Sequence, residues 1–245
     1  MSYPIKYPTP QGANVQIFSQ GGSTSDWVKP QGASFVWFTL IGGGGSGFSG
    51  SSGIYGGGSA AVTNCMVPAF LIPDVLRVSV ASRGVGAVSG AGTAGGTTSI
   101  IYQQKDGTGY TLLTAAGGGA GTGSTGGAGG AASTSNYFSC MGFFQSVAGQ
   151  TAGSGNNSPS ATTFLSAGAG GSGNDVTTNY GYLVSGAQQK RSGFLFFSPI
   201  LVGAGGASSG GSAEGGQGGP GCGGGSTNGS PGGSGGDGLV VIITW

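Results

Sequence analysis

Short runs of β-branched and aromatic residues alternate along the chain with tracts dominated by glycine. The runs are bounded by Gly, Pro or Asn, a pattern typical of strands. No segment of about 11 or more residues without Gly or Pro has the i, i+3, i+4, i+7 apolar spacing of an amphipathic helix. The sequence therefore predicts an all-β fold. The expected strands are residues 15–19, 35–41, 60–67, 76–80, 97–103, 110–114, 194–197 and 239–245.

Two of these runs, residues 35–41 and 239–245, are apolar on both faces. Such runs are typical of strands that are covered on both sides, and each of the two adjoins a glycine run. We therefore expect them to be central and adjacent. Truncating Trp37 to Ala should cost about 3–5 kcal/mol, and Trp27, expected in the turn before the first central strand, should contribute less. Residues 29–32 carry Pro at i+1 and Gly at i+3, as a type I turn prefers.

The glycine tracts allow two interpretations. Glycine-rich chains without a β pattern behave as flexible linkers when they are isolated. Alternatively, they form extended helices with three residues per turn, whose backbone groups bond to neighbouring helices. Gly at two of every three positions and the near-absence of charge favour packed helices of the polyglycine II type, and linkers remain the alternative. The tracts are residues 42–58, 84–96, 115–132 and 203–238, with the triplet pattern clearest in 215–220 and 232–237.

The amino-acid composition argues against several classes of function. Of the 245 residues, 61 are Gly, 5% are charged, the net charge is +1 and there is no His. Seven scattered basic residues cannot form the face that nucleic-acid binding requires. Without His and with six isolated carboxylates, general acid–base chemistry has few candidates. The glycine motifs show neither a Rossmann nor a P-loop context. We expect no enzyme, no cofactor and no nucleic-acid partner.

Metal, membrane and secretion signals are also missing from the sequence. The cysteines are odd in number, widely spaced and without a CxxC motif, so we expect free thiols packed as small apolar side chains. No aspartate lies in a D-x-D-x-D-G calcium loop, so turn formation is the expected role. No apolar run approaches the roughly 20 residues of a membrane helix, and no secretory signal is visible, which predicts synthesis in the cytosol. The residues concerned are Cys65, Cys140, Cys222, Asp74, Asp106, Asp175 and Asp237.

The order of several segments resembles the glycine-rich domain of bacteriophage tail-fibre and other virion surface proteins. In that family a W-x-x-P-x-G turn precedes an apolar strand that leads into a glycine run, as in residues 27–33 followed by 41–47. Residues 76–80 and 95–100 resemble its L-x-V-x-V and G-G-x-T-S segments. Residues 235–245 resemble its ending, in which a glycine tract leads into a terminal β-branched strand.

The chain also resembles, more weakly, the polyglycine-sandwich adhesins at the tips of long tail fibres. Those proteins carry an N-terminal fibre-attachment domain, whereas this glycine-rich domain opens almost at once. The resemblance implies one glycine-rich, β-sandwich-like domain over residues 1–245 with polyglycine II-type tracts. Residues 1–24 are expected to form an N-terminal arm or attachment segment and residues 104–199 a variable insertion.

Aromatic residues gather in or beside the central region, flanked by Gly, Ser and Asn. In the adhesins, loops between glycine tracts carry aromatics that contact saccharide or protein on the host surface, so the resemblance implies the same role here. Rigid aromatics offer a large contact area at low entropic cost. Core packing and subunit contacts are the competing explanations. The candidate contact residues are Tyr137, Phe138, Phe143, Phe144, Tyr180 and Tyr182.

Two functions follow from these expectations. The first is a tail-fibre or spike protein of the virion surface that mediates attachment to a host receptor. The second is a capsid, decoration or assembly protein with a purely structural role. A charged fraction of 5% is low for a free soluble monomer, which favours burial in an assembly. The expected partners are other virion proteins and further copies of the chain, most simply in a trimer, and the expected location is the virion.

Overall fold

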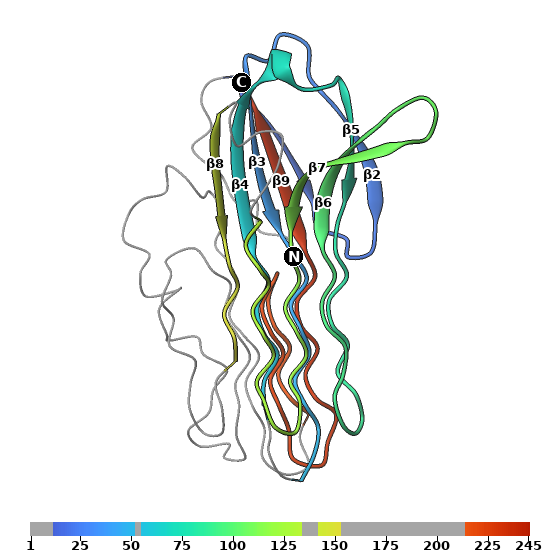
Figure 1. The fold of residues 1–245 in the computed structure, drawn as a ribbon, viewed down its shortest axis with the longest axis vertical. Helices are drawn as coiled ribbons and strands as arrows, with labels where there is room; N and C mark the ends of the chain where they lie inside the picture. Colours follow the sequence, from blue (N-terminus) through green and yellow to red (C-terminus); the bar gives the residue numbers. More distant parts are fainter. Residues whose placement is uncertain (1–11, 52–54, 134–141, 153–213) are drawn as a thin grey trace.

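The computed structural model describes residues 12–51, 55–133, 142–152 and 214–245 (Figure 1). Nine strands form two antiparallel sheets, and the only helical segment within these residues is one short 3-10 turn, η1, so the all-β prediction is confirmed. The elements are β1 (Asn14–Phe18), β2 (Thr24–Val28), β3 (Phe35–Ile41), β4 (Val62–Pro68), η1 (Ala69–Leu71), β5 (Val75–Ser79), β6 (Thr98–Gln103), β7 (Gly109–Ala115), β8 (Phe143–Val147) and β9 (Leu239–Thr244).

The first sheet has the strand order β1-β9-β3-β4-β8, and the second has the order β2-β5-β6-β7. The two predicted central strands, β3 and β9, are interior and adjacent, with Phe38 paired to Ile242 and Leu40 to Val240. That prediction is confirmed. Trp245 follows β9 and stacks on Phe35, with ring centroids 6.1 Å apart.

The main core lies between the sheets and draws side chains from both. Alternate residues of β3 enter it, while Ile41 on the opposite face joins a smaller cluster with Ala60 and Val62. Both faces of this strand are therefore buried, as its apolar pattern predicted. The main core comprises Trp27, Val36, Phe38, Leu40, Cys65, Val67, Ala69, Ile72, Leu76, Val78, Val80, Ile100, Leu112, Leu113, Ala115, Val240 and Ile242.

The expectation for Trp27 is wrong. This residue lies in strand β2 rather than in a turn, is 1% exposed, and meets Phe38 edge to face with centroids 5.9 Å apart. Trp37 is 6% exposed on the other face of β3, where Phe143 stacks on it. The polar neighbours of Trp27 in β2 concealed the strand, because only this one side chain of the five is buried.

The turn between β2 and β3 also differs from its prediction. The Ala33 N–H donates the hydrogen bond that closes the turn to the Pro30 carbonyl, and Gly32 has a φ of 79°. Gly therefore occupies i+2 with positive φ, as a type II turn requires. The turn begins one residue later than predicted, because only glycine adopts this backbone conformation readily.

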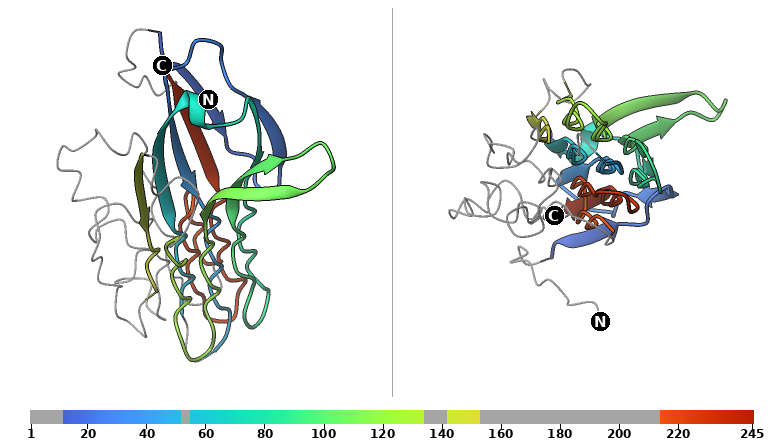
Figure 2. Two further views of the ribbon diagram at one scale, coloured as in Figure 1. Left: turned by 45° about the horizontal axis from the view of Figure 1, so that its top comes forward. Right: turned by 90° about the horizontal axis from the view of Figure 1, so that it is seen from below.

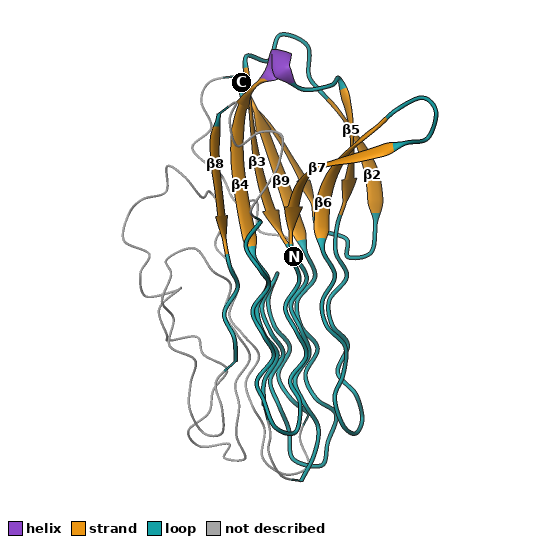
Figure 3. Cartoon of the chain, viewed as in Figure 1, coloured by secondary structure: helices purple, strands orange, loops and turns teal. Residues whose placement is uncertain are grey.

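The glycine tracts extend from the ends of the strands and run side by side down the long axis of the molecule (Figures 1 and 2). Figure 3 draws them as loops below the sheets. Within the expected arm, residues 14–18 form β1, and within the expected insertion, residues 109–115 and 143–147 form β7 and β8. The expected strand at 194–197 lies outside the described residues.

Candidate functional site: the glycine-tract bundle and the two ends of the molecule

Consecutive N–H groups in the tract that follows β3 bond to three different neighbouring tracts. Every third N–H donates to a carbonyl of the same neighbouring tract, and the residue number of the acceptor falls by three each time. Toward the first tract the donor–acceptor pairs are Gly42–Ala61, Gly45–Gly58 and Phe48–Tyr55; toward the second they are Gly43–Gly96, Ser46–Thr93 and Ser49–Gly90; toward the third they are Gly44–Gly236 and Gly47–Gly233. The N···O distances are 2.8–3.3 Å.

This pattern shows that the tracts are packed against one another and are not linkers. Falling partner numbers indicate antiparallel neighbours, and a three-residue repeat of bond direction is what three residues per turn would produce. The hydrogen bonds also satisfy backbone groups that have no partner within their own tract. The polyglycine II conformation itself stays a prediction.

Glycine is required inside the bundle because neighbouring backbones touch where a Cβ would stand. A Cβ on Gly44 would overlap the carbonyl of Cys222, and one on Gly118 would overlap that of Gly58. A Cβ on Gly236 would likewise overlap the carbonyl of Gly219. By contrast, a Cβ on Gly96 would meet its nearest atom, the Cβ of Ala81, at 3.5 Å, an ordinary contact.

Four connecting loops, which we call the tract-end loops, meet at the end of the bundle away from the sheets (Figure 1). Ser49 is buried among them, and its hydroxyl lies within hydrogen-bonding reach of the Val88 and Ser230 carbonyls. The Gly50 N–H donates to the Thr227 carbonyl, and the Thr227 N–H donates to the Phe48 carbonyl. The tract-end loops comprise, among the described residues, 48–51, 55, 85–92, 122–125 and 227–231.

The tract-end loops carry no charged side chain among their described residues. Ser124 and Thr125 are exposed, and the Thr122 hydroxyl accepts hydrogen bonds from the N–H groups of both. Val88 is 77% exposed, and Phe48 and Tyr55 are half-buried. The surface is therefore built of fixed hydroxyls and a few apolar side chains.

The structure places two of the six candidate aromatic contacts, both in β8. Phe143 stacks on Trp37 with centroids 5.7 Å apart, and Phe144 packs against the main core. These contacts fit core packing, the competing explanation, and the role in receptor contact stays a prediction. Tyr137, Phe138, Tyr180 and Tyr182 lie outside the described residues. The sequence signal for the tract-end loops was the Ser, Thr and Asn residues between glycine runs, which were not considered as a site.

A second surface lies at the opposite end, where η1 and the chain end after β9 are found (Figure 2). Six exposed apolar side chains lie at strand ends or in η1 at this end, on more than one face of the molecule, and we call them the strand-end residues. They are Val28, Phe35, Phe70, Leu71, Val75 and Trp245.

Cys65 is a free and buried thiol, as expected, Cys222 is buried, and Cys140 lies outside the described residues. Burial raises the pKa of the Cys65 thiol to about 12, so this thiol stays protonated and unreactive at neutral pH. Asp106 accepts a hydrogen bond from the Thr108 N–H, which lowers its pKa and fits the expected turn role. In the part of the chain that the structure describes, no group of three potential metal ligands occurs and no helix is long and apolar enough to cross a membrane.

Comparison with known proteins agrees with this architecture. A family model described as a glycine-rich domain matches residues 19–245, nearly the whole chain. No curated protein matches the chain. The match extends across the strands and the glycine tracts together, and the chain therefore belongs to the glycine-rich domain family.

Proposed function

We propose that this chain is a surface protein of a virus particle, a tail-fibre or spike component that attaches the particle to its host through the tract-end loops. The observation that carries the proposal is the convergence of four loops, distant in sequence, at one end of a hydrogen-bonded bundle. The resemblance to phage tail-fibre domains supplies the virion context. The proposal includes no catalytic step and no cofactor.

Rigidity is the property that makes the bundle suited to display. Each tract is held by bonds to several neighbours, so little conformational entropy remains for the loops to lose on binding. Buried Ser49 links three of the loops through Val88, Ser230 and the bridge to Gly90. A preorganised loop surface binds more tightly than a mobile one with the same contacts.

The composition of the tract-end loops indicates the ligand class. Exposed hydroxyls, glycines and a few aromatic or aliphatic side chains are the residues that adaptable binding loops use. Because the described loop residues carry no charge, the surface fits an uncharged host saccharide or protein loop. An anionic polymer would need cations that these residues lack.

Competition for host binding tests the proposal. The purified chain should block attachment of the particles that carry it, and antibodies to it should label intact particles. Ser124→Glu places a charge on an exposed loop residue and should abolish the competition. The control is Gln103→Glu, which adds the same charge to an exposed residue of β6 away from both ends of the molecule and should leave the competition unchanged. Equal melting temperatures would show that both variants fold.

A purely structural role in the capsid, spike or tail is the alternative. The exposed strand-end residues and the low charge favour it, since exposed apolar side chains are often covered in an assembly. In that case the chain would not compete for host binding, even if antibodies to it labelled intact particles. The competition measurement therefore separates the two functions.

A further inference from the structure

The chain contains one Asn-Gly step, Asn228–Gly229, and it lies in the tract-end loops. Asparagine is among the chemically labile residues of proteins, because the next main-chain nitrogen can attack its side-chain carbonyl carbon. Glycine in the next position favours the attack, since no Cβ shields its nitrogen. Gly229 is exposed, has a φ of 79°, and has open space where a Cβ would stand. The step is therefore accessible to water.

Hydrogen bonding separates this step from the other Asp-Gly and Asn-Gly steps of the described residues. In Asp106–Gly107 the glycine N–H donates to the Gln104 carbonyl at 3.0 Å, and in Asp237–Gly238 it donates to the Ala81 carbonyl at 2.9 Å. The Gly229 N–H makes no hydrogen bond to any described residue. A bonded nitrogen must give up its hydrogen bond before it can attack. The fold thus restrains two of these nitrogens and leaves the third one unrestrained.

We propose that Asn228 is a self-modification site, at which the amide is converted to aspartate and isoaspartate. The Gly229 nitrogen loses its proton and bonds to the Asn228 Cγ, while the Cγ–Nδ2 bond breaks and the amide leaves as ammonia with that proton. The product is a five-membered succinimide ring. Water then adds to one of the two ring carbonyls. Opening at Cγ gives aspartate, and opening at the main-chain carbonyl gives isoaspartate. Water is the only co-reactant.

The modification changes the tract-end loops in two ways. It places a carboxylate among described loop residues that carry no charge, and it takes the net charge of the chain from +1 to zero. In isoaspartate the main chain also runs through Cγ and is one carbon longer. The extra carbon falls between Thr227, which is hydrogen-bonded to Gly50 and Phe48, and Ser230, whose carbonyl accepts from Ser49. The contacts that hold these loops together should therefore loosen.

The proposed attachment relies on loops that are uncharged and preorganised. Because the modification removes both properties and proceeds in one direction, it should end host attachment as the protein ages. This consequence rests on the proposed function, whereas the modification itself does not.

Ageing of the purified full chain at mildly alkaline pH tests the modification. Peptide mass spectrometry and enzymatic methylation of isoaspartate should locate the loss of ammonia at Asn228. Asn14 is the matched control in the same molecule, because it is exposed but precedes β-branched Val15 and is paired within the sheet. It should keep its amide. The control variant is Asn228→Gln, whose longer side chain would have to close a six-membered ring. It should not acquire the loss at this position.

The same samples show whether the fold leaves the site open. An Asn228 amide that persists in the folded chain, but is lost from the chain unfolded in guanidinium chloride, would overturn the proposal. Equal loss at Asn14 and Asn228 would also overturn it, because the Asn-Gly step would then have no special reactivity.

Host competition separates the modification from its consequence. The aged wild-type chain should no longer block attachment, whereas the aged Asn228→Gln variant should still block it. A modified chain that competes as well as the fresh one would overturn the consequence alone. A fresh chain that never competes would overturn the attachment function and leave the modification standing.

Discussion

The sheet half of the molecule buries side chains, whereas the glycine-tract half buries backbone. In the main core, Trp27, Phe38 and Leu76 fill the space between two sheets. In the bundle, Gly44 and Gly236 lie so close to neighbouring carbonyls that no side chain fits between them. The first half depends on the hydrophobic effect, and the second on inter-tract hydrogen bonds that accompany the close approach.

This difference sets what each half tolerates. A side-chain core accepts substitutions that keep the total volume, since neighbours repack. A backbone core has no side chains that could move aside, so even one methyl group must displace a main chain. Glycine also loses more conformational entropy on folding than any other residue, and the hydrogen bonds of the bundle have to offset that cost.

The largest expected effect is from Gly44→Ala. Its Cβ would overlap the Cys222 carbonyl, and relief requires two bonded tracts to separate. Because only backbone could move aside, we expect a loss above the roughly 1–3 kcal/mol typical of overpacking and above the about 3–5 kcal/mol of truncating a buried aromatic, seen as a much lower melting temperature or failure to fold. Gly218→Ala should behave similarly, because its Cβ would also overlap Cys222.

Gly96→Ala is the control for the bundle. Its Cβ would make ordinary contacts. The substitution should therefore be neutral or should stabilise the fold by about 0.4–1 kcal/mol, because alanine restricts the unfolded chain. If Gly44→Ala melts at the same temperature as Gly96→Ala, the bundle is not a close-packed backbone core.

The next effect is at Trp27. Trp27→Ala should cost about 3–5 kcal/mol in the free energy of unfolding, as for other buried large aromatics, because it leaves a cavity beside Phe38 in the main core. Trp37→Ala should cost less, since that side chain lies outside the main core against Phe143. Urea denaturation measures both, and the reverse order would contradict the assignment of the core.

The sequence predicted the strands in which apolar and β-branched residues cluster and missed those whose pattern polar residues interrupt. β3 and β9 were found because both faces are apolar. β2 was missed because Trp27 is its only buried side chain among polar neighbours, and β8 because the polar Gln145 and Ser146 interrupt its apolar residues. The packing of tracts was predictable from the glycine triplets. Their partners were not, because tracts of the same composition differ only in the register of their hydrogen bonds.

The candidate site was predictable only in part. Aromatic content directed attention to residues 137–144 and 180–182, of which the structure places Phe143 and Phe144 in packing contacts. Neither end of the molecule could be recognised in advance. Ser49, Val88 and Ser230 meet only because the tracts that carry them pack together, and Phe35 stacks on Trp245 only because β3 pairs with β9.

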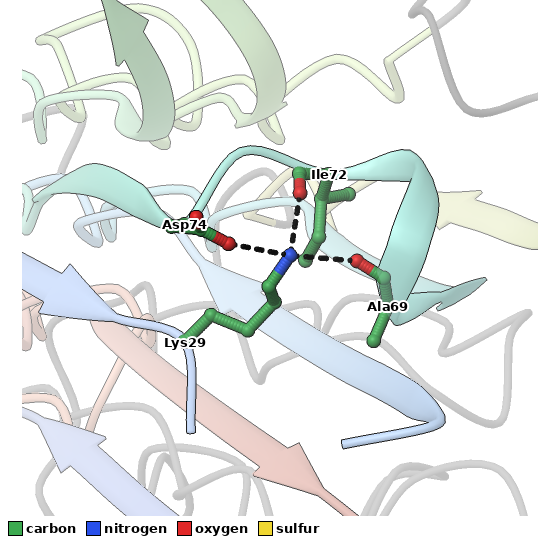
Figure 4. A network of polar contacts seen from close by, with 4 residues as sticks. All are labelled: Lys29, Ala69, Ile72 and Asp74. Carbon is green, nitrogen blue, oxygen red and sulfur yellow. Dashed lines mark hydrogen bonds and ion pairs between the residues drawn. The ribbon is translucent and has the colours of Figure 1, made fainter. Parts of the chain in front are cut away.

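A smaller effect is expected from the Lys29 network, which we call the brace (Figure 4): the Lys29 ammonium lies 2.9 Å from the Asp74 carboxylate and donates to the Ala69 and Ile72 carbonyls at 3.0 and 2.9 Å. Lys29→Met removes the charge-assisted hydrogen bonds to two carbonyls and to Asp74, and a hydrogen bond to a charged group contributes about 1.5–3 kcal/mol. The Met side chain keeps the packing of the aliphatic part of Lys29, which offsets part of this loss. We expect a net loss of about 1–2 kcal/mol. Arg77→Met is the control: its exposed pair with Asp26, at 3.5 Å, should contribute less than about 1 kcal/mol. Equal losses by chemical denaturation would mean that the brace is no stronger than a surface ion pair.

The smallest effect, absent at pH 7, concerns Cys65. Its pKa is raised to about 12 from an unperturbed 9.0 by burial, so the thiol favours folding fully below pH 9 and loses that contribution as the pH rises towards 12. Between these values the unfolded chain releases a proton that the folded chain keeps, and stability should fall by up to about 1.4 kcal/mol per pH unit. The variant Cys140→Ser with Cys222→Ser isolates this thiol, and adding Cys65→Ala gives the reference that cancels Tyr and Lys titration. The stability advantage of the Cys65 variant over the Cys65→Ala reference should shrink from pH 9 upwards. A constant difference would show that water reaches the Cys65 thiol. The core of the sheet half would then be hydrated at this position, whereas the close-packed backbones of the glycine-tract half leave no room for water.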